Sequence, residues 1–169
     1  MVLFMSRTLY VIRHGIAADR SLYPQDGDRP LTPKGQQKTE GVAQRLVALG
    51  ISVHQIVTSP LVRAQQTAEI LKTATLSDRL TVSPDLAPGG SLEDWLDWWM
   101  QDDPSDEATA AIVGHEPDLG EWVERLVWGE AQQHLVVKKA GVLGVSLPMG
   151  QDAIGQSELF WLTPPRFLL

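Results

Sequence analysis

The sequence predicts one α/β domain, spanning residues 1–169, with a largely parallel central sheet. Three short apolar segments, residues 8–12, 51–58 and 108–113, have the length and β-branched content of buried strands. Each segment ends in polar residues, and helical patterns lie between the segments. Strands that are apolar on both faces are typical of parallel sheets, which bind ligands beyond the carboxyl ends of their strands.

The composition is that of an acidic protein without cysteine. Its formal net charge of −7 argues against nucleic acid and anionic membranes as partners, because both attract basic surfaces. Without cysteine there is no disulfide, thiol nucleophile or thiolate metal site, and a cytoplasmic location is expected. We expect no signal peptide and no transmembrane helix, because the sequence has no basic leader and no sufficiently long apolar stretch. Either Met1 or Met5 could be the true start, and the oligomeric state is open.

The first predicted strand ends in Arg13, His14 and Gly15. A guanidinium and an imidazole thus stand at the sheet edge where a ligand is expected. Gly15 has no Cβ, so the backbone can turn sharply there and approach a ligand closely. A polar turn without a role is the alternative, since so short a motif also arises by chance.

A long polar loop, residues 16–30, comes next, and its length favours function or mobility. Thr32 is suited to cap the following helix and Pro33 to occupy its first turn, and Gly50 ends that helix. Arg29, near the end of the loop, faces either the site or the solvent.

The second predicted strand passes directly into a helix at Ser59 and Pro60, an N-cap followed by proline. Arg63 lies in or next to the first turn of this helix, where a cation opposes the helix dipole. An anion bound at that helix end would turn this penalty into an attraction. An exposed arginine without a role is the alternative.

A short strand at residues 80–83 and a helix at residues 92–101, capped by Ser91 and Asp94, are predicted next. Three tryptophans recur on this helix at helical spacing: Trp95, Trp98 and Trp99. Such a stripe is either part of the core or a partner-binding surface, since exposed tryptophans make good anchors.

The third strand runs into His115, and a helix at residues 119–127 follows with Asp118 and Glu121 as a capping pair. A buried structural histidine is the alternative role for His115. Further strands are predicted at residues 135–137, 141–147 and 158–162, the last two joined by a turn at residues 148–156. The two remaining histidines do not follow a strand end and are expected to be structural: His54 and His134.

The three strand ends gather two arginines and two histidines, namely Arg13, His14, Arg63 and His115. Metal binding is disfavoured, because the arginines would repel a cation and no carboxylate lies at metal-ligand spacing, so neither a metal nor another cofactor is expected. A pair of arginines instead matches a tetrahedral oxyanion such as phosphate. Nearby positive charge lowers a histidine pKa, which leaves a neutral ring able to act as a nucleophile in phosphoryl transfer.

Four blocks of this sequence resemble the histidine phosphatase superfamily, and within it the SixA-type phosphohistidine phosphatases. The blocks are Arg13–Gly15, Arg29–Thr32 with Gly35, Ser59–Thr67 and Val113–Pro117. They occur in the family's order and extend from the first strand to His115. The resemblance implies a three-layer α/β/α sandwich with a mixed, mostly parallel central sheet.

The resemblance also implies a role for each matching residue. His14 would be the nucleophile and would become phosphorylated, and water would then hydrolyse this intermediate. Arg13 and Arg63 would bind the phosphate together with Gly15. His115 would complete the pocket and stabilise the transferring group.

The mutases and sugar phosphatases of this superfamily place an acidic proton donor in an inserted helical region after the third strand, and that region is short here. The carboxylates that could replace the donor are Asp19, Asp85 and Glu116. A phosphoramidate leaving group tolerates the absence of a donor, because its imidazole nitrogen can leave already protonated, whereas an alkoxide needs a general acid. Arg29, Lys34 and Glu116 are expected at the pocket rim.

The leading hypothesis is a hydrolase that removes phosphate from a phosphohistidine-bearing protein of a signalling or phosphotransfer system. The short chain leaves little cap to enclose a small substrate, which favours a protein-borne phosphate. A phosphomonoesterase acting on a small metabolite, such as a sugar phosphate or nucleotide, is the alternative, and a carboxylate over the leaving group would favour it. A non-catalytic phosphate-binding module is disfavoured by the presence of both histidines and both arginines.

Overall fold

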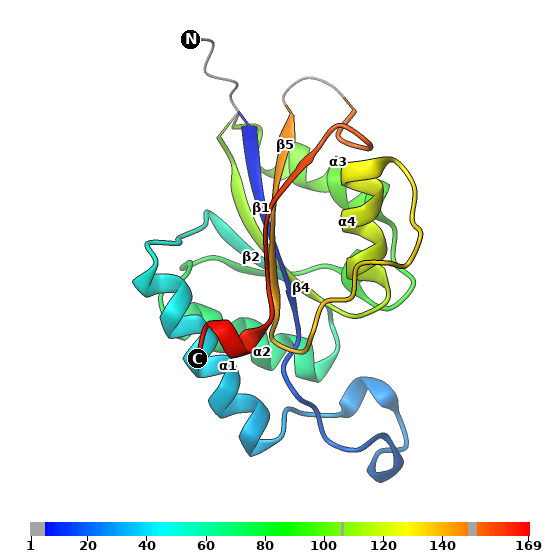
Figure 1. Cartoon of the computed structure of the whole chain (residues 1–169). Helices are drawn as coiled ribbons and strands as arrows, with labels where there is room; N and C mark the ends of the chain where they lie inside the picture. The colour runs from blue at the N-terminus through cyan, green and yellow to red at the C-terminus, as the bar shows by residue number, and fades with distance from the viewer. Residues whose placement is uncertain (1–5, 106, 149–151) are drawn as a thin grey trace.

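The computed structural model describes residues 6–105, 107–148 and 152–169. Its centre is a six-stranded mixed sheet with the strand order β3-β2-β4-β1-β5-β6 (Figure 1). The strands are β1 (Ser6–Arg13), β2 (Gln55–Thr58), β3 (Leu80–Val82), β4 (Thr109–Gly114), β5 (Val142–Pro148) and β6 (Glu158–Thr163). The first four are parallel to one another, whereas β5 pairs antiparallel with β1, and β6 antiparallel with β5.

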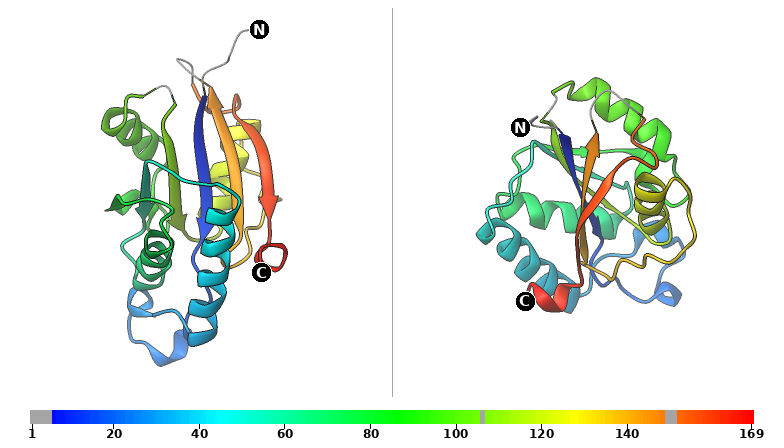
Figure 2. Two further views of the ribbon diagram at one scale, coloured as in Figure 1. Left: turned by 90° about the vertical axis from the view of Figure 1, so that its left-hand side faces the viewer. Right: turned by 45° about the horizontal axis from the view of Figure 1, so that its top comes forward.

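Helices cover both faces of the sheet (Figure 2). One face is covered by α1 (Pro33–Ala48) and α2 (Val62–Thr73), and the other by α3 (Leu92–Asp102) and α4 (Asp118–Trp128). Strand β1 contributes to both cores, because Leu9 and Val11 join the cluster under α3 and α4 while Ile12 joins the cluster under α1 and α2. This is the predicted three-layer α/β/α arrangement with a mixed sheet.

The tryptophan stripe of α3 belongs to the core. Trp95 and Trp99 are fully buried, and their ring centroids lie 5.2 Å apart. Trp98 is partly buried and packs against the same cluster. The alternative of a docking surface is therefore wrong for this stripe.

Two helices begin differently from the prediction. Helix α2 begins at Val62 rather than directly after Ser59, whose Oγ accepts a hydrogen bond from the Leu61 N–H at 3.3 Å. Asp118 is the first residue of α4 and does not cap it, because its carboxylate accepts a hydrogen bond from the Gly89 N–H at 2.7 Å. The predicted capping pair of α4 is thus wrong.

The predicted strand at residues 135–137 is a loop. The Leu135 N–H donates to the Glu124 carboxylate at 2.6 Å, and the Val137 N–H donates to the Glu116 carboxylate at 2.7 Å. Carboxylates thus satisfy the backbone amides that a neighbouring strand would otherwise bind.

The long loop after β1 contains two short 3-10 helices, η1 (Arg20–Leu22) and η2 (Asp26–Asp28), and lies beyond the carboxyl end of β1 in Figure 1. A single bridge between Ala17 and Leu31 closes it. Both possible start residues lie outside the described residues, as do residues 149–151 of the predicted turn between β5 and β6. Within the described ranges, no helix is long and apolar enough to cross a membrane.

Candidate active site

The carboxyl ends of β1, β2 and β4 meet at one edge of the sheet. The His14 N–H donates to the Gly114 carbonyl at 3.2 Å, and the Ser59 N–H donates to the Val113 carbonyl at 3.0 Å. These bonds continue the parallel ladders past the last strand residues, so His14, Ser59 and His115 emerge side by side. The predicted convergence of the strand ends is confirmed.

His14 is buried, with 4% of its surface exposed. Its Nδ1 lies 2.7 Å from the Gly15 carbonyl oxygen. Because a carbonyl oxygen only accepts, Nδ1 carries the proton and Nε2 keeps the lone pair. That lone pair accepts a hydrogen bond from Arg63 Nε at 3.2 Å. Burial lowers the pKa of His14 to about 3; the charges of His115, Arg63 and Arg13 act in the same direction, against the hydrogen bond with Gly15.

Arg63 is equally buried and uses three of its N–H groups within this site. Nε donates to His14, while Nη1 and Nη2 donate to the backbone carbonyl and the carboxylate of Asp26, each at 2.8 Å. A planar guanidinium in this arrangement presents a fork of donors that suits an oxyanion. The cation also lies in the first turn of α2, as the sequence predicts.

Gly15 is held by the same helix. Its N–H donates to Thr67 Oγ1 at 3.0 Å, and Thr67 Oγ1 donates in turn to the Arg63 carbonyl at 2.8 Å. A Cβ at Gly15 would overlap Thr39 Oγ1, so glycine is required by close packing against α1. Gly15 was expected to help bind phosphate, but its N–H is hydrogen-bonded to Thr67. Thr67 lies in the matching block Ser59–Thr67, and the sequence offered no separate reason to select it.

Arg13 approaches the site from the end of β1. Its Nη1 donates to the Val137 carbonyl at 2.9 Å, and its buried Nε has no partner among the described residues. Burial lowers the pKa of Arg13. The negative charge of Glu116 opposes this shift, whereas the positive charge of Arg63 adds to it. The Glu116 carboxylate holds the Val137 N–H. Glu116 therefore anchors the loop segment that positions Arg13.

His115 completes the group. Its ring centroid lies 5.1 Å from that of His14, with 52° between the ring planes. Nε2 lies 2.7 Å from Ser59 Oγ, and Nδ1 has no partner within the described part of the chain. Burial, together with the charge of the neighbouring Arg63, lowers the pKa of His115 to about 4. Both histidines of the site are therefore neutral at neutral pH.

Asp26 is a site residue that sequence reasoning missed. It lies in the long loop, and its carboxylate contacts Arg63, while Arg29 Nε lies 3.0 Å from Asp26 Oδ1. The Arg29 side chain is mostly buried and faces Asp26 rather than the solvent. Burial, and then the charges of Arg13, Arg29 and Arg63, lower the pKa of Lys139. The available signal was an acidic residue in a loop that also carries two arginines, Arg20 and Arg29.

The other nominated carboxylates have different partners. Asp19 accepts hydrogen bonds from Ser21 within η1, and Asp85 lies in a short turn beside Ser83. Lys34 is exposed in the first turn of α1. No group of three potential metal-binding side chains occurs within the described ranges.

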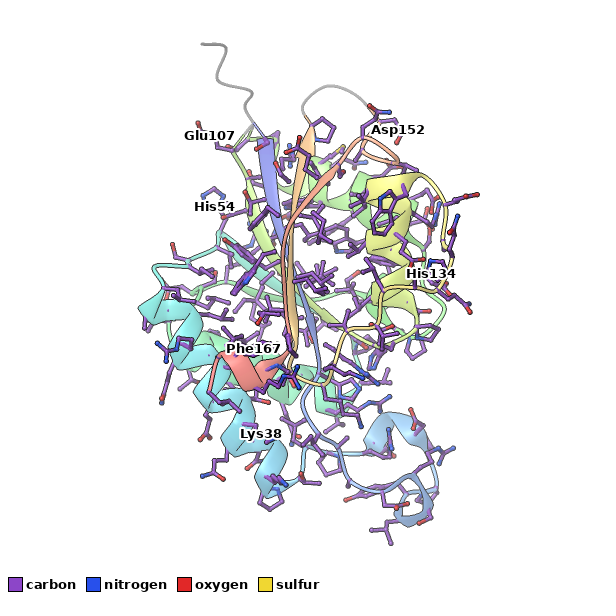
Figure 3. The ribbon with its side chains drawn as sticks, in the orientation of Figure 1. Lys38, His54, Glu107, His134, Asp152 and Phe167 are labelled. Atoms are coloured by element: carbon purple, nitrogen blue, oxygen red, sulfur yellow. The ribbon has the colours of Figure 1, made fainter. Side chains whose placement is uncertain are left out.

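The remaining histidines lie away from the strand ends, as Figure 3 shows. His54 is toward the opposite end of the sheet, where it pairs with Asp103 at 3.2 Å. His134 is exposed on the loop after α4. Both are separate from the site, as expected.

The family model described as histidine phosphatase superfamily (branch 1) matches residues 9–142. The chain belongs to this superfamily. An uncharacterized protein from Picosynechococcus sp. is 49% identical over 162 residues, which cover 95% of this chain and 98% of the relative. Phosphohistidine phosphatase SixA from Escherichia coli is 28% identical over 158 residues and 93% of each chain.

A solved structure has the same fold as this chain. The protein histidine phosphatase SixA, complexed with tungstate, superposes with a TM-score of 0.83 at 24% identity and covers 96% of this chain and 99% of its own. This protein is therefore a histidine phosphatase superfamily member of the SixA-type branch, and its relatives support phosphatase activity.

Proposed function

We propose that the protein hydrolyses phosphohistidine on a partner protein through a covalent phosphate on His14. The observation that carries this proposal is the fixed tautomer of His14. Its Nδ1–H is held by the Gly15 carbonyl, so the Nε2 lone pair points into a group of arginines. A neutral imidazole beside a bound phosphoryl group is a competent nucleophile.

The first step transfers the phosphoryl group between two imidazoles. The Nε2 lone pair of His14 attacks phosphorus, and the bond between phosphorus and the substrate's imidazole nitrogen breaks. Arg13 and Arg63 hold the phosphoryl oxygens and offset their charge, and an N–H of neutral His115 donates to one of them. The leaving ring departs neutral because its other nitrogen carries the proton, so this step needs no general acid.

Water completes the cycle. It attacks the phosphorus of phosphorylated His14, the P–N bond breaks, and both water protons remain with the phosphate product. His14 returns to the neutral form with its proton on Nδ1, the form that the Gly15 carbonyl stabilises. The two steps therefore balance without a metal or another cofactor.

An ester substrate would require a proton donor for its leaving alkoxide. Two carboxylates lie beside the arginines of the site: Glu116, which accepts the Val137 N–H and interacts with Arg13, and Asp26, which is bound by Arg63 and Arg29. Burial opposes the ionisation of Asp26, but its arginines bring its pKa below the ordinary value, which keeps it ionised at neutral pH. Burial raises the pKa of Glu116, but its carboxylate is held by the Val137 N–H and by Arg13. The engagement of both carboxylates favours phosphohistidine over phosphomonoesters as the substrate class.

The partner in this proposal is a phosphohistidine-bearing domain of a signalling or phosphotransfer protein. The cysteine-free sequence fits a cytoplasmic setting for such a reaction.

The proposal is tested by comparing donors. Purified protein is given a histidine-phosphorylated phosphotransfer domain and, separately, a panel of sugar phosphates and nucleotides, and phosphate release is followed. We expect rapid release from the phosphohistidine donor, loss of release in His14→Ala, and normal release in the control His134→Ala. Equal rates with small esters would indicate a metabolite phosphatase, and phosphate binding without turnover of any donor would indicate a binding module.

A further inference from the structure

Three arginines converge on the carboxylate of Asp26. Arg63 Nη2 donates to Oδ2 at 2.8 Å, while Arg29 Nε and Arg20 Nε lie 3.0 Å and 3.4 Å from Oδ1. The backbone carbonyl of Asp26 also accepts from Arg63 Nη1 at 2.8 Å. One loop residue thus binds both terminal nitrogens of the buried arginine that touches His14.

Asp26 thereby occupies donors of the arginine that is proposed to bind phosphate. Arg63 donates its Nε–H to His14 and one N–H of each terminal nitrogen to Asp26. Two of the five N–H groups of the guanidinium remain, one on each terminal nitrogen, so an oxyanion that binds there lies against the Asp26 carboxylate and both anions share one cation. A phosphoryl group and the Asp26 carboxylate therefore compete for one guanidinium.

The two partners of this ion pair differ in their exposure. The Arg63 side chain is 5% exposed, whereas the Asp26 side chain is 39% exposed and sits on the short helix η2 of the surface loop. Helix α2 fixes the arginine, and the Thr67 hydroxyl bonds its backbone carbonyl. The carboxylate is the partner that can move into solvent at modest cost, because a partly exposed ion pair contributes little to stability.

We propose that Asp26 is an internal competitor for phosphate that sets the oxyanion affinity of the site. Its carboxylate and backbone carbonyl hold Arg63, the arginine in contact with His14. A protein-borne phosphoryl group displaces the carboxylate with the help of other contacts with the partner, and the carboxylate returns to expel the inorganic phosphate product. This inference rests on the phosphate-binding role proposed for Arg63.

The experiment measures binding of inorganic phosphate by calorimetry in the native protein, Asp26→Asn and Asp28→Asn. Asp28 is a matched control, because it lies on the same short helix, is exposed, and has no side-chain hydrogen bond or ion pair in the described structure. Removing the competitor should tighten phosphate binding about tenfold in Asp26→Asn, the size of one charge-assisted hydrogen bond. Asp28→Asn should stay within about twofold, the effect of net charge alone.

An affinity in Asp26→Asn that equals that of Asp28→Asn, or is weaker than native, would overturn the proposal, because Asp26 would then support the bound anion. A second measurement uses the native protein and does not depend on a variant. Phosphate is titrated while the carboxyl 13C resonance of Asp26 is recorded by NMR. We expect this resonance to shift to that of a free carboxylate as the site fills, and an unchanged resonance at saturation would contradict the displacement.

Both measurements are made without substrate or turnover. If no phosphohistidine donor were hydrolysed, the proposed function would fail, while the competition between Asp26 and phosphate would still be decided by these data.

Discussion

Arg63 Nε donates a hydrogen bond to Nε2 of His14 at 3.2 Å, the nitrogen that carries no proton. The contact brings together the end of β1 and the first turn of α2. The positive charge of Arg63 opposes protonation of the imidazole. The same charge favours the binding of phosphate next to the imidazole. Several expectations depend on this relationship and on the packing that maintains it.

The protein should lose stability as pH falls from about 6.5, the usual histidine pKa. The folded-state pKa values of His14 and His115 are lowered to about 3 and about 4. Between these values and 6.5 the unfolded chain binds protons that the folded protein excludes, so the free energy of unfolding decreases with decreasing pH. Urea unfolding from pH 7 to pH 4 measures this slope. The double variant His14→Gln/His115→Gln should have a shallower slope, and His134→Gln the native one; a double variant with the native slope would refute this explanation.

Gly15→Ala should destabilise the protein by about 2 kcal/mol, the typical cost of overpacking. The new Cβ would overlap Thr39 Oγ1. Gly27→Ala is the control, because a Cβ there has only an ordinary contact with Leu61 at 3.8 Å. Thermal melting of both variants measures this difference in stability, and Gly27→Ala should melt close to the native temperature. Addition of Thr39→Ala should recover part of the loss in Gly15→Ala, and no recovery would place the strain elsewhere.

Glu124→Gln should destabilise the protein by about 2–3 kcal/mol, since a buried acceptor of several amides is lost. The Glu124 side chain is buried and accepts four backbone N–H groups, from Gln132, Gln133, His134 and Leu135. Amide hydrogen exchange at these four residues should accelerate in the variant, and phosphatase activity should fall because the same loop carries the carbonyl that binds Arg13. Glu121→Gln, which alters an exposed contact with Gln133, should leave exchange unchanged. Native exchange in Glu124→Gln would show that the carboxylate does not hold the loop.

Ser59→Ala should lower kcat/KM about tenfold while the protein stays folded, the value of one hydrogen bond to a catalytic group. Ser59 Oγ lies 2.7 Å from His115 Nε2 and fixes the orientation of that ring. Ser91→Ala is the matched control, since it removes a hydroxyl that caps α3 far along the chain and should affect stability alone. Unchanged kcat/KM in Ser59→Ala would show that Ser59 does not position the His115 ring for catalysis.

The sequence is sufficient to predict the core strands of the sheet and the meeting of four polar side chains at their carboxyl ends. Strand ends can be recognised from local apolar runs, and the parallel topology then brings Arg13, His14, Arg63 and His115 together without knowledge of side-chain contacts. The same local logic identifies α3, although burial of Trp95 depends on which face meets the sheet.

Contacts between distant segments were not predictable in this way. Asp26 reaches Arg63 across 37 residues of sequence that include α1 and β2, and the loop that carries Asp26 has no periodic pattern. Residues 135–137 have the composition of a strand, yet the carboxylates of Glu116 and Glu124 bind their amides. In both cases a side chain from another element determines the local structure.

The position of the phosphate on the enzyme tests the central claim most directly. The protein is mixed briefly with a phosphohistidine donor, quenched in alkali and digested, and the phosphorylated nitrogen is assigned by mass spectrometry and NMR. Phosphate on Nε2 of His14 is predicted, because Nδ1 donates its proton to the Gly15 carbonyl. Phosphate on Nδ1 of His14, on another residue, or on no residue during active turnover would contradict the account.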